Sequence, residues 1–249
     1  MDLEDVTEVY QAIKGVDFVY HSGAIVSFNK SDYEQMRRIN IEGTTNIVNA
    51  CLEHKIKKLA FISSVASIGR EGKGKYSEKN KWNSRKENSF YALTKYKAEN
   101  EVWRGIEEGL NAVITNQGII IGPSHWGRSS TTIFKQIHKG LSYFPEGKNG
   151  FIDVRDVARA TIALMDSKIN RERFILVGEN LPYKSVFDDI ALCLNKPKPY
   201  KKATKSLLEI AWRLEAIRCF ITNKKQSITK ETARTASQIN IYENQKIIM

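Results

Sequence analysis

Three side chains in the first half of the sequence could carry out acid/base chemistry. Ser64 ends a short apolar segment, and Tyr91 and Lys95 lie four residues apart in a segment with helical spacing, so they share one helix face. A free tyrosine has a pKa of about 10, and a neighbouring cation lowers that pKa because it favours the phenolate. Ser64 could then hold a substrate carbonyl or hydroxyl oxygen while Tyr91 moves its proton.

A Tyr-x-x-x-Lys pair is also common by chance, as an ordinary pair on a helix surface. The position of this pair after a strand that ends in Ser63-Ser64 favours the chemical interpretation. That strand, 57–64, opens with two lysines, continues through an apolar run and closes with small polar residues, which is typical of a buried parallel strand that ends at a crevice.

The surrounding pattern alternates strands with helices. We predict strands at 16–24, 57–64, 111–123 and 174–177, and helices at 6–14, 31–54, 89–108, 131–138 and 185–194. We expect Gly15 to stop the first helix and Ser31 or Asp32 to cap the second. This alternation predicts an α/β protein with a Rossmann-like parallel sheet.

The character of the chain changes after Pro123, where turns and short elements dominate. We predict a partial dinucleotide-binding core at 1–122. Residues 123–249 would mainly form a smaller substrate-binding lobe, with segments about 151–179 returning to the core.

A basic segment near the end of the chain has apolar residues at helical spacing. These residues could form a membrane-surface helix, or they could cover a core or a substrate pocket, which we favour; they are Leu207, Leu208, Ala211, Leu214 and Ile217.

The composition is that of a soluble protein, with 41% hydrophobic and 27% charged residues. The net charge of +11 could indicate nucleic acid, but the basic residues are scattered and form no recognisable nucleic-acid module. We therefore expect no nucleic-acid partner, and attraction for an anionic dinucleotide is a milder explanation of the charge.

The cysteines and histidines suggest neither disulfides nor a metal. Cys51, Cys193 and Cys219 lie in apolar segments without Cys-x-x-Cys spacing, so we expect buried free thiols in a reducing compartment. No histidine has metal-ligand spacing, and His21 fits a satisfied strand end better than a ligand. With no signal peptide at the start and no apolar run long enough to cross a bilayer, we predict a cytoplasmic protein.

Taken together, the motifs resemble the extended short-chain dehydrogenase/reductase superfamily, in the NAD-dependent epimerase/dehydratase group. The resemblance covers nearly the whole chain. It rests on Val19–Ala24, on Asn40-x-x-Gly43-Thr44-x-Asn46, on Phe61–Ser64 with Tyr91-x-x-x-Lys95, on Gly122-Pro123 and on Phe151–Ala158. The segment Ile228–Thr232 and Tyr242 resemble the dihydroflavonol reductase and 3β-hydroxysteroid dehydrogenase-like branch.

This resemblance implies a cofactor, NAD or NADP, and a role for each matching residue. Tyr91 would be the general acid/base, Lys95 would lower its pKa and hold the nicotinamide ribose, and Ser64 would orient the substrate oxygen. Asn40 would belong to a locally distorted helix that holds a water in a proton relay with Lys95. The cofactor-binding residues would be Asp2, Leu3, Ser22, Gly23, Ala24, Tyr91, Lys95, Asn116, Gly118 and Ile119.

The chain departs from the family pattern in two places. Gln117 stands where the family usually has proline, beside the nicotinamide. No Gly-x-Gly-x-x-Gly motif occurs in the sequence, so on the order of 60 residues of the usual opening, about two βαβ units, have no counterpart. We expect a fragment of a full enzyme, in preference to a natural truncation, with poor dinucleotide binding and an exposed sheet edge.

Three functions remain open. The favoured one is an NAD(P)-dependent oxidoreductase acting on a carbonyl or secondary alcohol of a small, apolar substrate, because the segment from Leu207 to Ile217 is apolar. A nucleotide-sugar epimerase or dehydratase uses the same tyrosine and lysine, but Val65-Ala66 supplies no acid after Ser64. A non-catalytic scaffold or dinucleotide sensor is the third. A homodimer is compatible with any of them, and no metal is expected.

Overall fold

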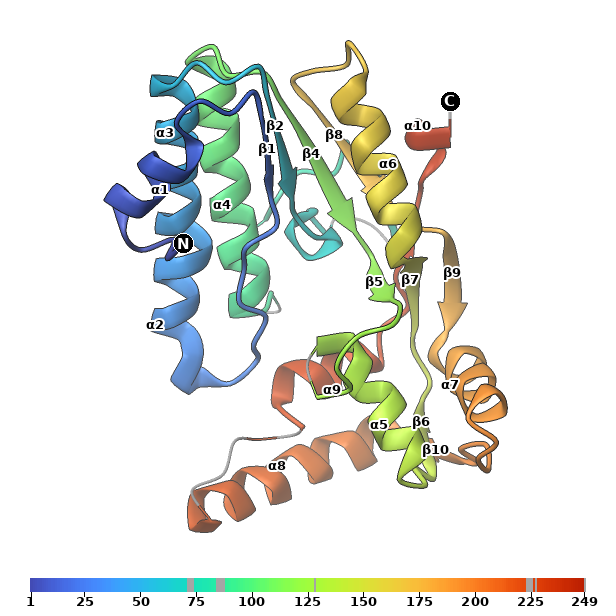
Figure 1. Cartoon of the computed structure of the whole chain (residues 1–249). Helices are drawn as coiled ribbons and strands as arrows, with labels where there is room; N and C mark the ends of the chain where they lie inside the picture. Colours follow the sequence, from blue (N-terminus) through green and yellow to red (C-terminus); the bar gives the residue numbers. More distant parts are fainter. Residues whose placement is uncertain (71–73, 84–87, 128, 223–225, 227, 249) are drawn as a thin grey trace.

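A four-stranded parallel sheet forms the centre of the molecule. The computed structural model describes residues 1–70, 74–83, 88–127, 129–222, 226 and 228–248. The sheet runs in the order β1-β2-β4-β8, built from β1 (Phe18–His21), β2 (Lys58–Ile62), β4 (Ala112–Gln117) and β8 (Glu172–Leu176). All three strand pairs are parallel (Figure 1), which confirms the predicted α/β, Rossmann-like fold.

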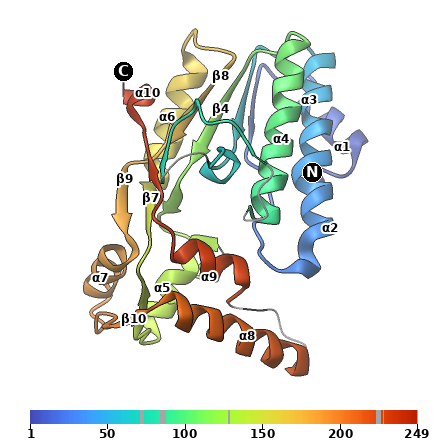
Figure 2. The same cartoon turned by 180° about the vertical axis from the view of Figure 1, so that it is seen from behind.

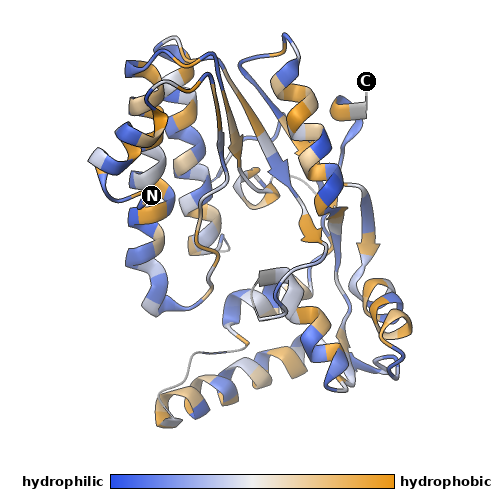
Figure 3. Ribbon diagram, viewed as in Figure 1, coloured by the Kyte–Doolittle hydropathy of each residue, from blue (hydrophilic) through white to orange (hydrophobic). Residues whose placement is uncertain are grey.

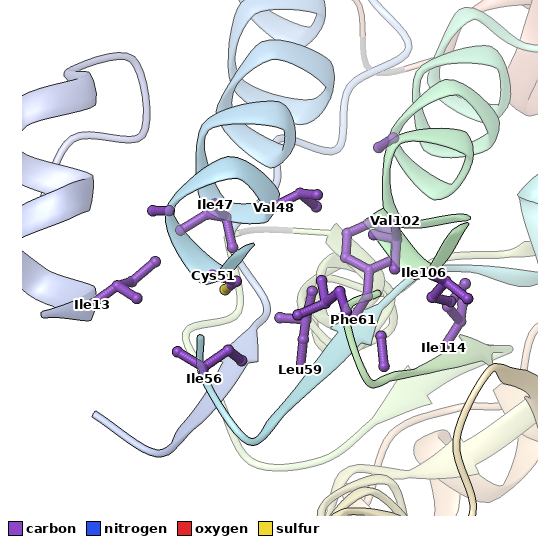
Figure 4. Packing of buried hydrophobic residues seen from close by; sticks show 14 of the residues in the cluster. Ile13, Ile47, Val48, Cys51, Ile56, Leu59, Phe61, Val102, Ile106 and Ile114 are labelled. Carbon is purple, nitrogen blue, oxygen red and sulfur yellow. The ribbon is translucent and has the colours of Figure 1, made fainter. Parts of the chain in front are cut away.

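Helices cover both faces of this sheet. One face is covered by α1 (Val6–Ile13), α3 (Gly43–Glu53) and α4 (Phe90–Glu107), and the other by α6 (Val154–Asp166), as Figures 1 and 2 show from opposite sides. Side chains from α3, α4 and the strands interlock in a buried cluster (Figure 4) around Phe61, which is 1% exposed. This packing fixes the end of β2 against α4, the helix that carries Tyr91 and Lys95.

The helix ends follow their sequence signals in part. Gly15 has a φ of +79° just after α1, as expected of a residue that stops a helix. Ser89 caps α4, because its hydroxyl accepts the Ala92 N–H at 2.9 Å. Asp32 occupies the N-cap position of α2 (Tyr33–Met36), as predicted, but its side chain makes no capping hydrogen bond there. A 3₁₀ turn, Lys30–Asp32, runs straight into the helix, and Asp32 accepts the Ser27 hydroxyl at 2.7 Å.

The second helix is distorted where the resemblance implied. Between α2 and α3 the chain forms a π-helical turn at Arg37–Glu42, and Asn40 lies within it. A π turn inserts one residue into the helical repeat and occurs often at functional sites.

The predicted strand 111–123 is two strands in two different sheets. β4 ends at Gln117, and β5 (Ile119–Ile121) pairs with β7 (Lys148–Asp153), which in turn pairs with β9 (Glu179–Pro182). The chain changes sheet at Gly118, where a Cβ atom would lie 2.5 Å from the Gly150 carbonyl oxygen. Only glycine fits this close approach between the two backbones.

A lower layer of the molecule packs on this second sheet (Figure 1). Its core joins α5 (Thr132–His138) and α7 (Tyr183–Cys193), next to the strand pair β6 (Tyr143–Pro145) and β10 (Lys201–Ala203). The long helix α8 (Lys205–Thr222) and α9 (Lys230–Ala236) follow. The short elements are a 3₁₀ turn at Val65–Ser67, β3 (Lys75–Tyr76), a 3₁₀ turn at Ser129–Thr131, β11 (Ile241–Tyr242), which pairs with β3, and α10 (Gln245–Ile248).

The prediction that the apolar residues of the long basic helix α8 cover a core or a pocket holds only in part. Leu208 and Ala211 are half-buried, but Leu207, Leu214 and Ile217 are 38%, 62% and 58% exposed. The apolar residues of α8 are therefore divided: Leu208 lies on the side that packs against α9 and lines a pocket, whereas Leu207, Leu214 and Ile217 cover nothing among the described residues. Among the described helices, none has the length and apolar character needed to cross a bilayer.

Two further predictions concern the burial of the cysteines and the edge of the sheet. All three cysteines are free, but only Cys51 and Cys219 are buried, so the prediction for the exposed Cys193 was wrong. The sheet does have an exposed edge, because β1 is an end strand and Phe18 and Tyr20 are 49% and 48% exposed.

Candidate active site

The three residues singled out by their chemistry meet at the carboxyl end of β2. Ser64 lies two residues beyond the end of this strand, and its side chain is close enough to the phenol of Tyr91, on the first turn of α4, to influence the pKa of that phenol. The Ser64 hydroxyl oxygen also accepts the Ala66 N–H at 3.1 Å, which fixes the serine side chain at the start of a 3₁₀ turn. Phe28 packs edge-on against the Tyr91 ring, with ring centres 6.0 Å apart.

Lys95 lies one turn further along α4 and is 2% exposed. Its ammonium group donates to the Ile62 carbonyl oxygen at 2.9 Å and lies 4.4 Å from the centre of the Phe61 ring. Burial lowers the pKa of Lys95 to about 8, although the Glu99 carboxylate opposes this shift. At neutral pH the side chain is therefore still mostly charged.

The predicted acidification of Tyr91 is absent from this structure. Burial raises the pKa of Tyr91, and the hydrogen bond with Ser64 offsets only part of that increase. The Lys95 ammonium points to the end of β2, so the phenol gains little from its charge. Tyr91 is accordingly protonated at neutral pH, which suits a proton donor.

Asn40 is 1% exposed, and its side chain ties the segment after β1 to α4. Its amide accepts the Ile25 N–H at 2.7 Å and donates to the Ile25 carbonyl oxygen at 2.9 Å and to the Thr94 hydroxyl at 3.1 Å. The Thr94 hydroxyl in turn donates to the Tyr91 carbonyl oxygen at 2.8 Å. Asn40 thus holds the backbone of the Tyr91 turn in place.

His21 is a buried neutral residue at the end of β1, as expected. Burial, with a contribution from the Lys95 charge, lowers the pKa of His21 to about 3. The Thr44 hydroxyl donates its only proton to the Asn40 carbonyl oxygen at 2.7 Å, so the His21 Nε2 atom, 2.9 Å from that hydroxyl, must be the protonated nitrogen.

Beneath the site lies a buried carboxylate that sequence reasoning missed. Glu99 is 2% exposed and accepts hydrogen bonds at 2.8 Å from Ser63, Ser67 and Asn116. Arg173 on β8 pairs with its other oxygen at 3.1 Å. The available signal was its position four residues after Lys95, which places a carboxylate on the buried face of α4.

The candidate cofactor residues at the N-terminal side lie together. A Cβ atom on Gly23 would be 2.8 Å from the Leu3 side chain, so Leu3 lies directly over the small residues that follow β1. The Leu3 carbonyl oxygen accepts the Asn46 side-chain amide at 2.9 Å, which anchors the start of the chain to α3. Asp2, Ser22 and Ala24 are exposed beside it.

The other candidates at the end of β4 are directed elsewhere. Asn116 is fully buried, and its side-chain nitrogen donates to the Ser64 carbonyl oxygen at 3.1 Å as well as to Glu99. Gly118 and Ile119 belong to the passage into the second sheet, and Ile119 packs against the core of the lower layer.

Lys95 offers a place for a ligand at the end of β2. Among the described residues the Lys95 ammonium donates one hydrogen bond, to Ile62, whereas an ammonium group has three donors. Two N–H donors of the ammonium group are therefore left for a further partner. No group of three or more metal-binding side chains occurs within the described part of the chain.

Trp126 packs its ring near Phe134 and His138 and is 39% exposed.

The sequence matches known proteins over most of its length. It is 26% identical to sterol demethylase protein B of Methylococcus capsulatus, over 80% of this chain and 61% of that protein. It is 27% identical to a dihydroflavonol 4-reductase-like protein of Synechocystis, over 99% of this chain and 74% of that protein. It is 26% identical to cinnamoyl-CoA reductase 1 of Petunia hybrida, over 70% of this chain and 55% of that protein. The chain thus spans about half to three quarters of the length of these relatives.

Solved structures show the same fold. The crystal structure of gox2253 has a TM-score of 0.79 at 26% identity and covers 99% of this chain and 76% of that one. The second structure is the dTDP-glucose 4,6-dehydratase DesIV of Streptomyces venezuelae with NAD bound. Its TM-score is 0.77 at 14% identity, over 99% of this chain and 70% of that one. A family model matches residues 1–178, more than half of the sequence. The chain therefore belongs to the NAD dependent epimerase/dehydratase family.

Proposed function

We propose that the protein is an NAD(P)-dependent oxidoreductase that reduces the carbonyl group of a small apolar substrate, or oxidises the corresponding secondary alcohol. The observation that carries the proposal is that Ser64 and Tyr91 lie close together beyond the end of β2, with buried Lys95 one turn away on α4. The relatives described as dihydroflavonol and cinnamoyl-CoA reductases support the reaction class and an aromatic or otherwise apolar substrate.

The proposed roles follow from the chemistry of the pair. Ser64 donates a hydrogen bond to the carbonyl oxygen of the substrate and orients its carbon. Tyr91 donates its proton to that oxygen as negative charge develops there, and in the oxidative direction it takes the proton back. A bound nicotinamide dinucleotide supplies or accepts the hydride. The raised pKa of Tyr91 keeps the phenol protonated, which favours the reductive direction at neutral pH.

Lys95 and Asn40 act around this pair. Lys95 would hold the ribose of the cofactor through its two remaining N–H donors, with its charge maintained by Glu99. Asn40 is a positioning residue, because its amide fixes the turn that carries Tyr91 through Thr94. The proposed water relay through the π turn remains a prediction.

The dehydratase alternative lacks a candidate acid, whereas an epimerase would use the same tyrosine and lysine and stays an alternative. A dehydratase needs an acid near the substrate, but Ser64 is followed by Val65-Ala66, and the nearby Glu99 is occupied by its own donors. The exposed face of α8 no longer supports an apolar substrate, so that part of the proposal depends on the relatives alone.

The test begins with calorimetric titration of NADH and NADPH into this chain and into an upstream-extended form where the gene encodes one. A screen of apolar aldehydes and ketones, followed by nicotinamide absorbance, then identifies turnover. We expect Tyr91→Phe to lower the rate at least about 100-fold while dinucleotide binding is retained. The matched control is Tyr96→Phe on the same helix, whose ring stacks on Trp82. Equal rates for both variants would refute the proposal.

A further inference from the structure

Helix α8 is apolar on two opposite faces, and only one of them is packed. The packed face contains Leu208, Trp212 and Cys219 and lies against α9. The opposite face carries five residues at alternating spacings of three and four, which form one stripe along all five turns; their exposed fractions are Leu207 38%, Ile210 56%, Leu214 62%, Ile217 58% and Ile221 76%. We call this set the α8 stripe.

The α8 stripe is larger than the scattered apolar residues of an ordinary surface. Phe220, 90% exposed, lies next to its C-terminal end, and the helix of 18 residues is about 27 Å long. Figure 3 shows hydrophobic residues along the whole helix, which lies below the sheet layers and away from them. The stripe is flanked by Arg213 on one side and Arg218 on the other, both exposed.

The charge around this helix is concentrated and positive. Residues 196–230 contain ten lysines and arginines against two glutamates, a net charge of +8 out of +11 for the whole protein. The two glutamates, Glu209 and Glu215, form ion pairs with the flanking arginines on the helix itself. The excess charge therefore remains on the lysines, of which Lys198 and Lys205 are exposed.

We propose that α8 is a membrane-surface helix that binds the face of a bilayer containing anionic phospholipids. An apolar stripe flanked by arginines fits the boundary between headgroups and acyl chains, where the guanidinium groups reach back to the lipid phosphates. Lysines beside such a helix are attracted by the negative surface potential of anionic lipids.

The charge also selects this occupant over a second copy of the chain. Two copies joined through their α8 stripes would bring two regions of charge +8 together, which opposes association. An anionic bilayer neutralises the same charge. Because α8 does not have the character of a membrane span, it would lie in the plane of the surface.

The test is co-sedimentation of the full chain with vesicles of phosphatidylcholine that contain about 30% phosphatidylserine, compared with pure phosphatidylcholine. We expect binding to the anionic vesicles, loss of that binding at high salt and little binding to the neutral ones. Leu214→Gln with Ile217→Gln should weaken binding about tenfold or more. The matched control is Ile162→Gln with Leu192→Gln, which replaces two residues that are 50% and 69% exposed on other helices.

A second pair of variants separates local from overall charge. Lys198→Glu with Lys205→Glu should weaken binding at least about tenfold more than Lys14→Glu with Lys97→Glu, although both change the net charge equally. Absence of binding to anionic vesicles, or equal loss in the stripe variant and its control, would overturn the proposal. So would light scattering that shows a dimer which the stripe variant dissociates, because the stripe would then bind a second copy.

Discussion

Replacing Glu99 by glutamine should destabilise the protein strongly. The substitution keeps the size of the side chain but removes its charge from a site that is 2% exposed. One of its oxygens faces three donors, on Ser63, Ser67 and Asn116, and the other faces the Arg173 guanidinium. A glutamine can satisfy one side as an acceptor, but its NH₂ group then faces donors on the other side.

The size of the effect follows from these partners. Removing one member of a buried ion pair costs about 3–5 kcal/mol, because the other charge is left without its partner. Arg173 also donates to the Glu78 and Asn80 carbonyl oxygens, and serine hydroxyls can rotate to accept, so some of this cost is recovered. We therefore expect a loss of about 2–4 kcal/mol in the free energy of unfolding.

Urea unfolding followed by circular dichroism measures this loss. The matched control is Glu107→Gln, on the same helix and exposed, which should change the free energy of unfolding by less than about 0.5 kcal/mol. If Glu99→Gln unfolds at the same urea concentration as Glu107→Gln, the carboxylate does not hold the network together and our description of the site is wrong.

The remaining predictions concern buried titratable groups and the sheet edge. His21 has a pKa of about 3 in the folded state and about 6.5 in the unfolded state, so the unfolded state binds more protons below pH 6.5. Between pH 6.5 and 5 the wild type should therefore lose about 2 kcal/mol in the free energy of unfolding relative to His21→Gln. If urea unfolding gives both proteins the same dependence of stability on pH, the prediction is wrong. Lys95 has a pKa of about 8 in the folded state and 10.5 in the unfolded state, so the unfolded state binds more protons above pH 8. From pH 8 to 9.5 the wild type should therefore gain about 2 kcal/mol in the free energy of unfolding relative to Lys95→Met in the same assay. Absence of this gain would show that the ammonium group is not desolvated. At the β1 edge, Tyr20→Lys should raise the protein concentration at which light scattering first detects aggregates, whereas the exposed-face control Leu192→Lys should not.

The order of strands and helices could be predicted because each element has a strong local signal. The apolar run before Ser64 is long enough for a buried strand, and Ser89 supplies a cap before the helix that carries Tyr91. The break at Gly118 was missed, although Asn116-Gln117-Gly118 interrupts the apolar residues of 111–123, because such an interruption does not show that the chain enters a second sheet. It depends on a backbone contact with Gly150, which is distant in sequence.

The chemical pair could be found in the sequence, but its electrostatics could not. Spacing places Tyr91 and Lys95 on one helix face, yet the direction of the Lys95 ammonium is set by the Ile62 carbonyl oxygen on another element. Burial of the phenol depends on tertiary packing. This burial raises the pKa of Tyr91, whereas the sequence predicted that the pKa would be lowered. The partners of Glu99 come from the segment after β2, from β4 and from β8, so the sequence shows the carboxylate but not what it binds.

The charge of Lys95 links the stability of the fold to the proposed chemistry. Burial of an ammonium group costs free energy, and it lowers the pKa of Lys95 almost into the neutral range. Glu99, one turn away and fixed by Arg173 and the serines, opposes that shift without contacting the proposed substrate site. A network that looks purely structural therefore keeps the lysine charged at neutral pH. Loss of Glu99 should consequently weaken any ligand that needs this charge, even under conditions in which the fold survives.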